Sequence, residues 1–140
     1  MAKFFKVNVS VVIFNNDKVL IVKRSMKEDV FPGLWGIPGG TVDMSDQNLE
    51  SALEREVMEE VGIKIKNFCV IQNNIKEKEI YGMVYIVYTA DYESGEPKAL
   101  EDTEEVSWMT IENMENMEFT PKTSDVIKNA YERKFQESIK

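Results

Sequence analysis

Three glutamates crowd onto little more than one helical turn in the middle of the chain. Residues 51–64 read SALEREVMEEVGIK, and Glu56 stands three and four residues before Glu59 and Glu60. On a helix these spacings make Glu56 a neighbour of both, and like charges placed so repel by roughly 0.2–0.5 kcal/mol per pair. Two interpretations follow. One is a solvated acidic helix face. The other is a site for a hard divalent cation such as Mg²⁺ or Mn²⁺, which takes oxygen ligands and completes its shell with water and phosphates.

A glycine-rich segment precedes these glutamates, and a glycine follows them. Residues 31–40 read FPGLWGIPGG, and the run from Arg55 to Ile63 reads REVMEEVGI. This combination resembles the signature box of the Nudix hydrolase family, in which a Gly is followed by a Glu and then by Arg-Glu, an aliphatic residue, any residue, Glu-Glu, any residue, Gly and an aliphatic residue. The run from Arg55 to Ile63 matches the second half of the box at every position. The resemblance spans most of the chain, and its specific part is residues 31–63.

The first half of the box departs from the family. Between Gly40 and Arg55 the chain has one residue more than the family spacing, and no Glu stands where the first one belongs, the nearest matches being Asp46 and Gln47. An insertion within the helix would rotate everything beyond it by roughly 100°, whereas a loop accepts an extra residue at little cost. We therefore expect the loop at 43–48 to absorb it, with Asp46 reaching Arg55 in place of the missing glutamate.

The resemblance implies both a fold and a chemistry. The expected fold is α/β, a Nudix-type α/β/α sandwich with a mixed β-sheet, formed by residues 1–140 as a single domain. The implied reaction is hydrolysis of a pyrophosphate linkage in a nucleoside diphosphate derivative, with Mg²⁺ (or Mn²⁺) as cofactor. A divalent ion suits this reaction because it polarises a phosphoryl oxygen and acidifies a coordinated water. The expected metal ligands are Gly39, Glu56, Glu59 and Glu60.

The resemblance also implies catalytic roles. Arg55 is similar to the box arginine that holds the acids in place, with an ordinary surface pair to Glu59 four residues on as the alternative. Glu59 is expected to be either a second metal ligand or a base. Several enzymes of the family take a base from a loop before a Trp, which favours Glu105, although a solvated acidic loop explains these acids equally well. The acids preceding Trp108 are Glu101, Glu104 and Glu105.

Aromatic residues near the box are candidates for contact with a nucleobase, because their faces stack bases. Phe31 and Trp35 lie in the glycine-rich segment, and Tyr81 shares one face of an expected strand with Tyr85. For each ring, core packing is the alternative. Gly40 completes the expected substrate-binding set, since a residue without a side chain lets backbone approach a bound group.

Composition excludes several kinds of function. The chain has no His, which removes Ser-His and Cys-His nucleophiles and the usual His zinc sites. Its net charge of −8 disfavours binding to a nucleic-acid polymer. No apolar stretch is long enough to cross a bilayer, and Asn8 and Ser10 interrupt the first apolar run, which argues against a signal peptide. We expect a cytoplasmic protein with no membrane partner, in which the lone Cys69 is a buried structural thiol.

Hydrophobic periodicity predicts the elements around the box. Runs rich in β-formers at 7–14 and 18–22 flank Asn15-Asn16-Asp17, whose residues tolerate positive φ, and this pattern indicates a hairpin. The remaining expected elements are a loop at 24–47, a helix from about Asn48 to Val61 closed by Gly62, strands at 65–73, 79–91 and 105–109, a helical turn or two at 111–117, and a C-terminal helix capped by Thr123 or Ser124.

Three functional hypotheses remain. The first is a pyrophosphohydrolase of MutT type that acts on a small nucleoside polyphosphate. The favoured substrate is a (deoxy)nucleoside triphosphate, and oxidised triphosphates are included in this class. The second is a catalytically weak nucleotide-binding or regulatory Nudix module, suggested by the missing first glutamate. The third, an acidic interaction domain, leaves Pro38-Gly39-Gly40 unexplained. Lys78 stands about fifteen residues beyond Ile63, where the ADP-ribose pattern has a Pro, and this weakens an ADP-ribose assignment. The sequence contains no signal for an oligomeric state.

Overall fold

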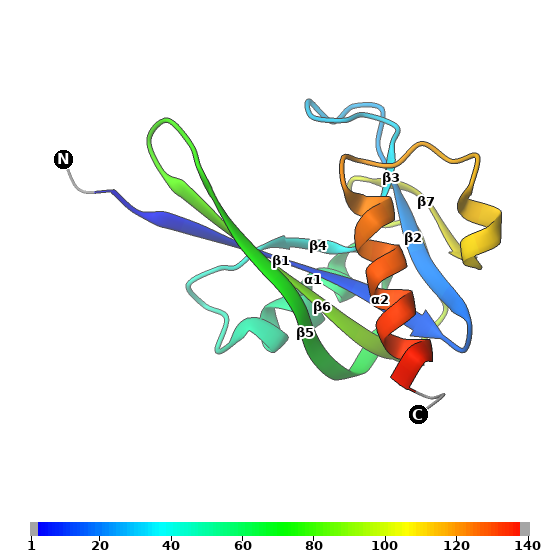
Figure 1. The fold of residues 1–140 in the computed structure, drawn as a ribbon. Helices are drawn as coiled ribbons and strands as arrows, with labels where there is room; N and C mark the ends of the chain where they lie inside the picture. The colour runs from blue at the N-terminus through cyan, green and yellow to red at the C-terminus, as the bar shows by residue number, and fades with distance from the viewer. Residues whose placement is uncertain (1–2, 138–140) are drawn as a thin grey trace.

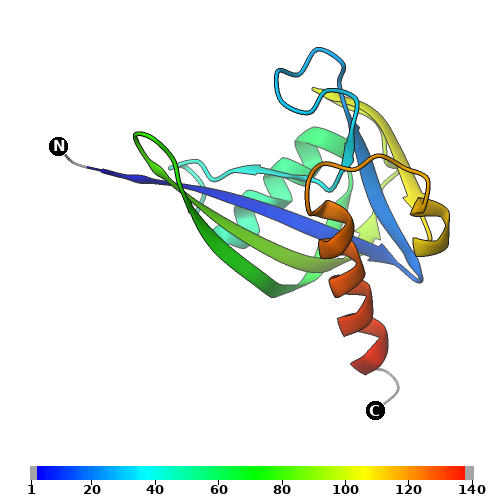
Figure 2. The same cartoon turned by 45° about the horizontal axis from the view of Figure 1, so that its top comes forward.

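A computed structural model describes residues 3–137 of the chain as a twisted sheet with one helix on each face (Figures 1 and 2). Within this range neither helix combines the length and the apolar composition needed to cross a bilayer. The elements in chain order are β1 (Phe5–Asn15), β2 (Lys18–Arg24), β3 (Trp35–Gly36), β4 (Gly39–Thr41), α1 (Leu49–Val61), β5 (Lys64–Glu77), β6 (Gly82–Ser94), β7 (Thr103–Met109), the 3-10 turn η1 (Ile111–Met114) and α2 (Thr123–Glu137).

The sheet is mixed, and β1 and β2 each pair with three other strands among the described residues. Along the path β3-β2-β1-β6-β5, β1 is parallel to β6 and antiparallel to β2, while β4 adds to β1 and β7 adds to β2. The turn between β1 and β2 passes through Asn16 at a φ of 57°, a conformation that Asn tolerates well. The hairpin predicted there is confirmed.

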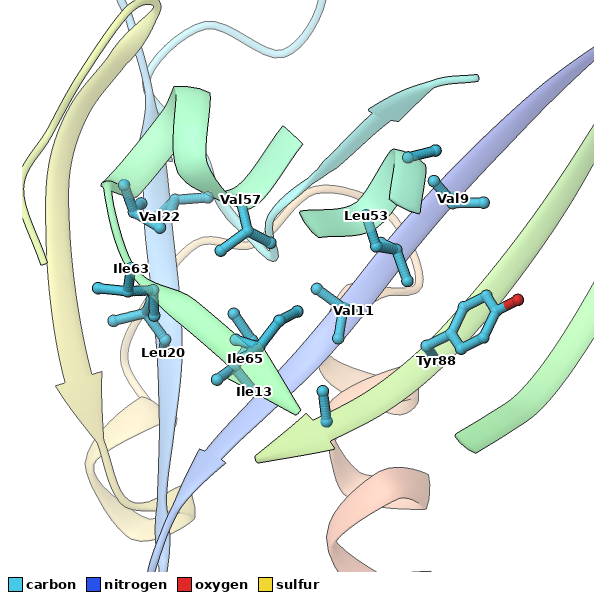
Figure 3. Packing of buried hydrophobic residues seen from close by; sticks show 13 residues of the cluster. Val9, Val11, Ile13, Leu20, Val22, Leu53, Val57, Ile63, Ile65 and Tyr88 are labelled. Carbon is cyan, nitrogen blue, oxygen red and sulfur yellow. The ribbon is translucent and has the colours of Figure 1, made fainter. Parts of the chain in front are cut away.

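Alternation along β1 divides the core into two clusters. Val9, Val11 and Ile13 point to one face and Val12 and Phe14 to the other, as the two-residue repeat of a strand requires. The α1-side core consists of Val9, Val11, Ile13, Leu20, Val22, Ala52, Leu53, Val57, Val61, Ile63, Ile65, Tyr88 and Ala90 (Figure 3). The α2-side core consists of Val12, Phe14, Val19, Ile21, Ile71, Val87, Met114, Ile127 and Ala130. The α/β/α sandwich is thereby confirmed.

Helix α1 begins and ends where its sequence predicts. Asn48 is the N-cap, its side chain accepting a hydrogen bond of 2.7 Å from the N–H of Ser51, and Gly62 ends the helix at a φ of 70°. Glycine, which has no β-carbon, takes that left-handed angle without strain. The extra residue of the box therefore lies in the loop before Asn48, as predicted, and the carboxylates keep their position relative to the apolar stripe of the helix.

Elsewhere the elements differ from the expected ones. The segment predicted as a loop at 24–47 contains the short strands β3 and β4. Strand β5 runs on to Glu77, through polar residues predicted to be a connection, because at the sheet edge polar side chains can face water on both sides. The expectation of a buried Cys69 is wrong: it lies exposed on β5, next to a register irregularity that begins near Asn67 (φ 58°).

Candidate active site

Two glycines allow strand β4 to lie between β1 and α1. A β-carbon on Gly39 would come within 2.4 Å of the carbonyl oxygen of Val9 and 2.7 Å of the Cα of Ser10. A β-carbon on Gly40 would instead fall 2.4–2.6 Å from the carboxylate atoms of Glu56. The first glycine thus brings the two strands together, and the second leaves the space that the Glu56 carboxylate occupies.

Glu60 and Glu56 carry the most perturbed carboxyl groups near this glycine pair. Burial raises the pKa of Glu60 to about 8, and the N–H of Gly39, which donates to its Oε2 at 3.2 Å, offsets only part of that effect. Burial also raises the pKa of Glu56, while Arg55 opposes the shift. Two acids that lose water and repel each other are stabilised by a cation between or beside them.

Arg55 joins these acids to the loop before the helix. Its Nη1 donates to Glu56 Oε1 at 3.0 Å and lies 3.3 Å from Glu59 Oε2. Its Nε and Nη2 each donate to the carboxylate of Asp46 at 2.9 Å, which raises the pKa of Arg55. The predicted contact between Asp46 and Arg55 is therefore present. Glu59, half-buried at the edge of the group, has Arg55 as its neighbour.

A further carboxylate, that of Glu101, acts electrostatically on the pair from outside the helix. The loop before β7 is hydrogen-bonded to the end of α1. The N–H of Lys98 donates to the carbonyl of Val61 at 3.0 Å, and the N–H of Leu100 donates to the carbonyl of Glu60 at 2.9 Å. The next residue, Glu101, has a φ of 50°, and its charge contributes to the raised pKa values of both Glu56 and Glu60.

Glu105, the acid predicted as the base before Trp108, lies in β7 and not in the loop, because the strand predicted from residue 105 begins at Thr103. It lies exposed within β7, opposite Lys23 of β2. Among the three acids considered before the tryptophan, Glu101 is the one whose charge acts on the acids of α1. The strand predicted at 105–109 already included Glu105, but sequence alone does not show which residue of the preceding loop lies near the acids of the helix.

The predicted aromatic contacts lie in three different environments. Phe31 is exposed on the loop between β2 and β3, at a φ of 49°. Trp35 packs against the α2-side core, on the face away from α1, as the packing alternative predicted. Tyr81 is not on a strand: it lies in the turn between β5 and β6, where its ring stacks on Phe4 at 5.8 Å. The prediction that Tyr81 lies on a strand is wrong, because β6 starts at the next residue, Gly82.

The donor set fits a hard divalent cation. Within residues 3–137 no three acidic, His or Cys side chains converge on one point, but Mg²⁺ needs only one or two carboxylates when water and substrate phosphates fill its remaining positions. Glu56 and Glu60, set against the Gly39–Gly40 backbone, provide two oxygen donors in an electronegative site. These are the groups that would hold the ion.

A mixed sheet between two helices, with a Gly-Gly strand set against an acidic helix, defines a Nudix-type fold, and comparison with known proteins agrees. The sequence profile of the NUDIX domain matches residues 4–130. The chain is 30% identical to ADP-ribose pyrophosphatase of Methanocaldococcus jannaschii over 81% of its length, although it covers only 66% of that protein. It is 26% identical to the nucleoside triphosphatase NudI of Enterobacter sp. strain 638, over 80% of this chain and 86% of that one.

A solved structure supports the same assignment. The MutT NUDIX hydrolase of Burkholderia pseudomallei superposes with a TM-score of 0.76 at 27% identity, over 89% of this chain and 97% of that one. The chain belongs to the NUDIX family and is a Nudix hydrolase.

Proposed function

We propose that this chain uses Mg²⁺ or Mn²⁺ to hydrolyse a pyrophosphate linkage in a (deoxy)nucleoside triphosphate. The observation that carries the proposal is the pair of carboxyl groups, Glu56 and Glu60, placed against the Gly39–Gly40 backbone, with the charge of Glu101 acting on both of them. Such a site repels a polyphosphate unless its own charge is offset. A divalent cation, when bound, screens the phosphate oxygens and acidifies a coordinated water.

The side chains of the site take distinct roles in this proposal. Glu56 and Glu60 hold the cation beside the backbone of Gly39, and Arg55 orients Glu56. As a water oxygen attacks phosphorus and the bridging P–O bond breaks, the proton of the water passes to a carboxylate. We assign that role to Glu101, because Arg55 already occupies the oxygens of Glu59. Glu59, predicted as a ligand or base, becomes the second candidate, and Glu105 the third.

ADP-ribose is the second candidate substrate, and one observation favours it. The Methanocaldococcus jannaschii relative is named an ADP-ribose pyrophosphatase. The residue that weakens this assignment, Lys78, lies in the β5–β6 turn, where its N–H donates to the carbonyl of Tyr81 at 2.8 Å. The relative named a nucleoside triphosphatase supports the triphosphate, because this chain covers 86% of that relative but 66% of the ADP-ribose pyrophosphatase.

A panel of nucleoside and deoxynucleoside triphosphates with ADP-ribose, each supplied with Mg²⁺ or Mn²⁺, tests the proposal. Chromatography of the products distinguishes nucleoside monophosphate with pyrophosphate from AMP with ribose 5-phosphate. We expect turnover of a triphosphate, its loss in excess chelator, and its recovery on adding Mg²⁺. Turnover that survives the chelator would contradict the metal assignment, and turnover of ADP-ribose alone would replace the substrate assignment.

A nucleotide-binding module without catalysis is the remaining alternative. The missing first glutamate of the box favours this alternative. Asp46 weakens it, because its carboxylate accepts hydrogen bonds from Arg55 in place of that glutamate. Calorimetric binding of a nucleotide without any product in the panel would favour the module. We further propose that residues 1–140 act as one domain in the cytoplasm, which limited proteolysis and cell fractionation test.

A further inference from the structure

Asp46, in the loop before α1, accepts two hydrogen bonds from Arg55. Its Oδ1 accepts a hydrogen bond from Arg55 Nε and its Oδ2 one from Arg55 Nη2, both at 2.9 Å. Two parallel bonds to a carboxylate fix the plane of a guanidinium as well as its position. The Asp46 side chain is 6% exposed and that of Arg55 31%, so water has less access to the carboxylate than to the guanidinium.

The loop itself fixes the Asp46 carboxylate. Its Oδ2 also accepts from the N–H of Asp43 at 2.8 Å, and the N–H of Asp46 donates to the carbonyl of Asp43 at 3.0 Å. The backbone and hydroxyl of Ser45 close the same turn onto the Asp43 carboxylate. A carboxylate anchored by backbone in this way has little freedom, so it can hold the guanidinium of Arg55 in one position.

The opposite edge of the guanidinium faces the acids of the helix. Arg55 Nη1 donates to Glu56 Oε1 at 3.0 Å, and Nη2 also reaches the carbonyl of Thr41 at 3.3 Å. We propose that Asp46 is a positioning residue of the cation site: it holds Arg55 so that the Glu56 carboxylate stays in the space beside Gly40, and its charge keeps Arg55 from neutralising that carboxylate. This inference rests on the proposed function.

Removing the charge of Asp46 should weaken cation binding in two ways. Arg55 is freed to turn fully toward Glu56 and Glu59, and its own positive charge is no longer offset. Both effects weaken a cation bound by Glu56. Partners that orient metal ligands from outside contribute about 10–100-fold to affinity or activity, and we expect Asp46→Asn to weaken Mn²⁺ binding by about tenfold, the lower end of that range, because it acts through Arg55.

The test is a titration with Mn²⁺ in the absence of any nucleotide, with the free ion followed by electron paramagnetic resonance. Glu54→Gln is the matched control, since it removes the same charge from the exposed side of α1 one residue before Arg55. Asp46→Glu keeps the charge and is expected to restore part of the lost affinity. Urea unfolding of each variant separates a weakened site from a weakened fold.

Each outcome bears on the inference. It is supported if Asp46→Asn binds Mn²⁺ about tenfold more weakly while Glu54→Gln binds as wild type. Equal affinities for these two variants overturn it, even if Asp46→Asn lowers the stability to urea. If the wild type hydrolyses nothing in the nucleotide panel while the difference in Mn²⁺ affinity is present, the proposed function fails and the positioning role stands. A wild type that binds no Mn²⁺ contradicts both.

Discussion

Helices α1 and α2 have similar lengths, but their charged residues contact different parts of the molecule. They contain 13 and 15 residues, and each buries one apolar face on its own side of the sheet. On α1 the charged residues contact each other and the loop before the helix. On α2, Lys134 instead reaches across to Asp91 on β6 at 2.7 Å. The comparison indicates that Lys134 joins α2 to the sheet, whereas the charged residues of α1 are arranged around a site.

The largest expected effect separates the two helices by activity. Glu60→Gln should lower kcat/KM on the order of 10³-fold, as the loss of a principal electrostatic group does, while Lys134→Met should leave it unchanged. Steady-state kinetics on the substrate found in the panel make the measurement. If the α2 variant lost activity to the same extent, the distinction between the helices would be wrong.

The same variant should show the opposite effect on stability. In the folded, metal-free protein the pKa of Glu60 is raised from 4.5 to about 8, so the folded state binds the extra proton and stability falls as pH rises between these two values. Glu60→Gln should lack that fall and unfold at a higher urea concentration than wild type at pH 8. A wild type whose stability does not decline over this interval would contradict the burial of the carboxyl group.

The next effect tests whether the two helices are equal in their apolar packing. Leu53 and Ile127 are both buried, one in each core, and replacing either with Ala should cost about 2–5 kcal/mol of the free energy of unfolding. Urea denaturation at one pH compares the two. A loss confined to one helix would show that the cores, and not only the charges, differ.

A smaller and more specific effect compares the two glycines of β4. Gly39→Ala places a methyl group against the backbone of β1, so we expect a loss of about 1–3 kcal/mol in stability. Gly40→Ala meets only the flexible end of Glu56, which can move aside, so stability should change little while kcat/KM falls. A Gly40→Ala enzyme of full activity would show that the position of the Glu56 carboxylate does not matter.

The smallest effect concerns acid stability. Hydrogen bonds from Arg55 lower the pKa of Asp46 to about 2, and although burial raises the pKa of Asp91, hydrogen bonds from Lys134 and Asn67 lower it overall. Each pair therefore stabilises the fold above the ordinary aspartate pKa of 3.8, and the contribution is lost as pH falls through the lowered value. For the half-buried pair of Asp91 and Lys134 we expect below about 1 kcal/mol. Urea midpoints from pH 6 to pH 2.5 should decline less steeply in Asp46→Asn than in Asp91→Asn.

The sequence predicted the helix of the box because local signals agree there. Asn48 caps it, its apolar residues recur at helical spacing, and Gly62 closes it, so no distant part of the chain was needed to set its ends. The contact between Asp46 and Arg55 was predictable for the same reason, since loop and helix are adjacent and an insertion in the helix would have misplaced its faces.

The parts that sequence missed depend on pairing between distant segments. Cys69 is exposed because β5 is the last strand of the path, and the order of strands cannot be obtained from local pattern. The charge of Glu101 acts on the acids of α1 because its loop is hydrogen-bonded to the end of that helix. Tyr81 and Tyr85 do not share a strand face, because the β5–β6 turn includes Tyr81 and β6 starts only at Gly82.

The parallel pairing of β1 with β6 bears on how quickly the protein folds. Phe5 lies opposite Gly82 and Phe14 opposite Asp91, so every pair in this ladder joins residues 77 positions apart in the chain. Closing so long a loop costs entropy before any contact repays it, and domains rich in such distant pairings fold slowly. Strand β4 and its two glycines rest on β1, so the acidic helix can form early while the surroundings of its carboxylates are completed only once the first and sixth strands have met.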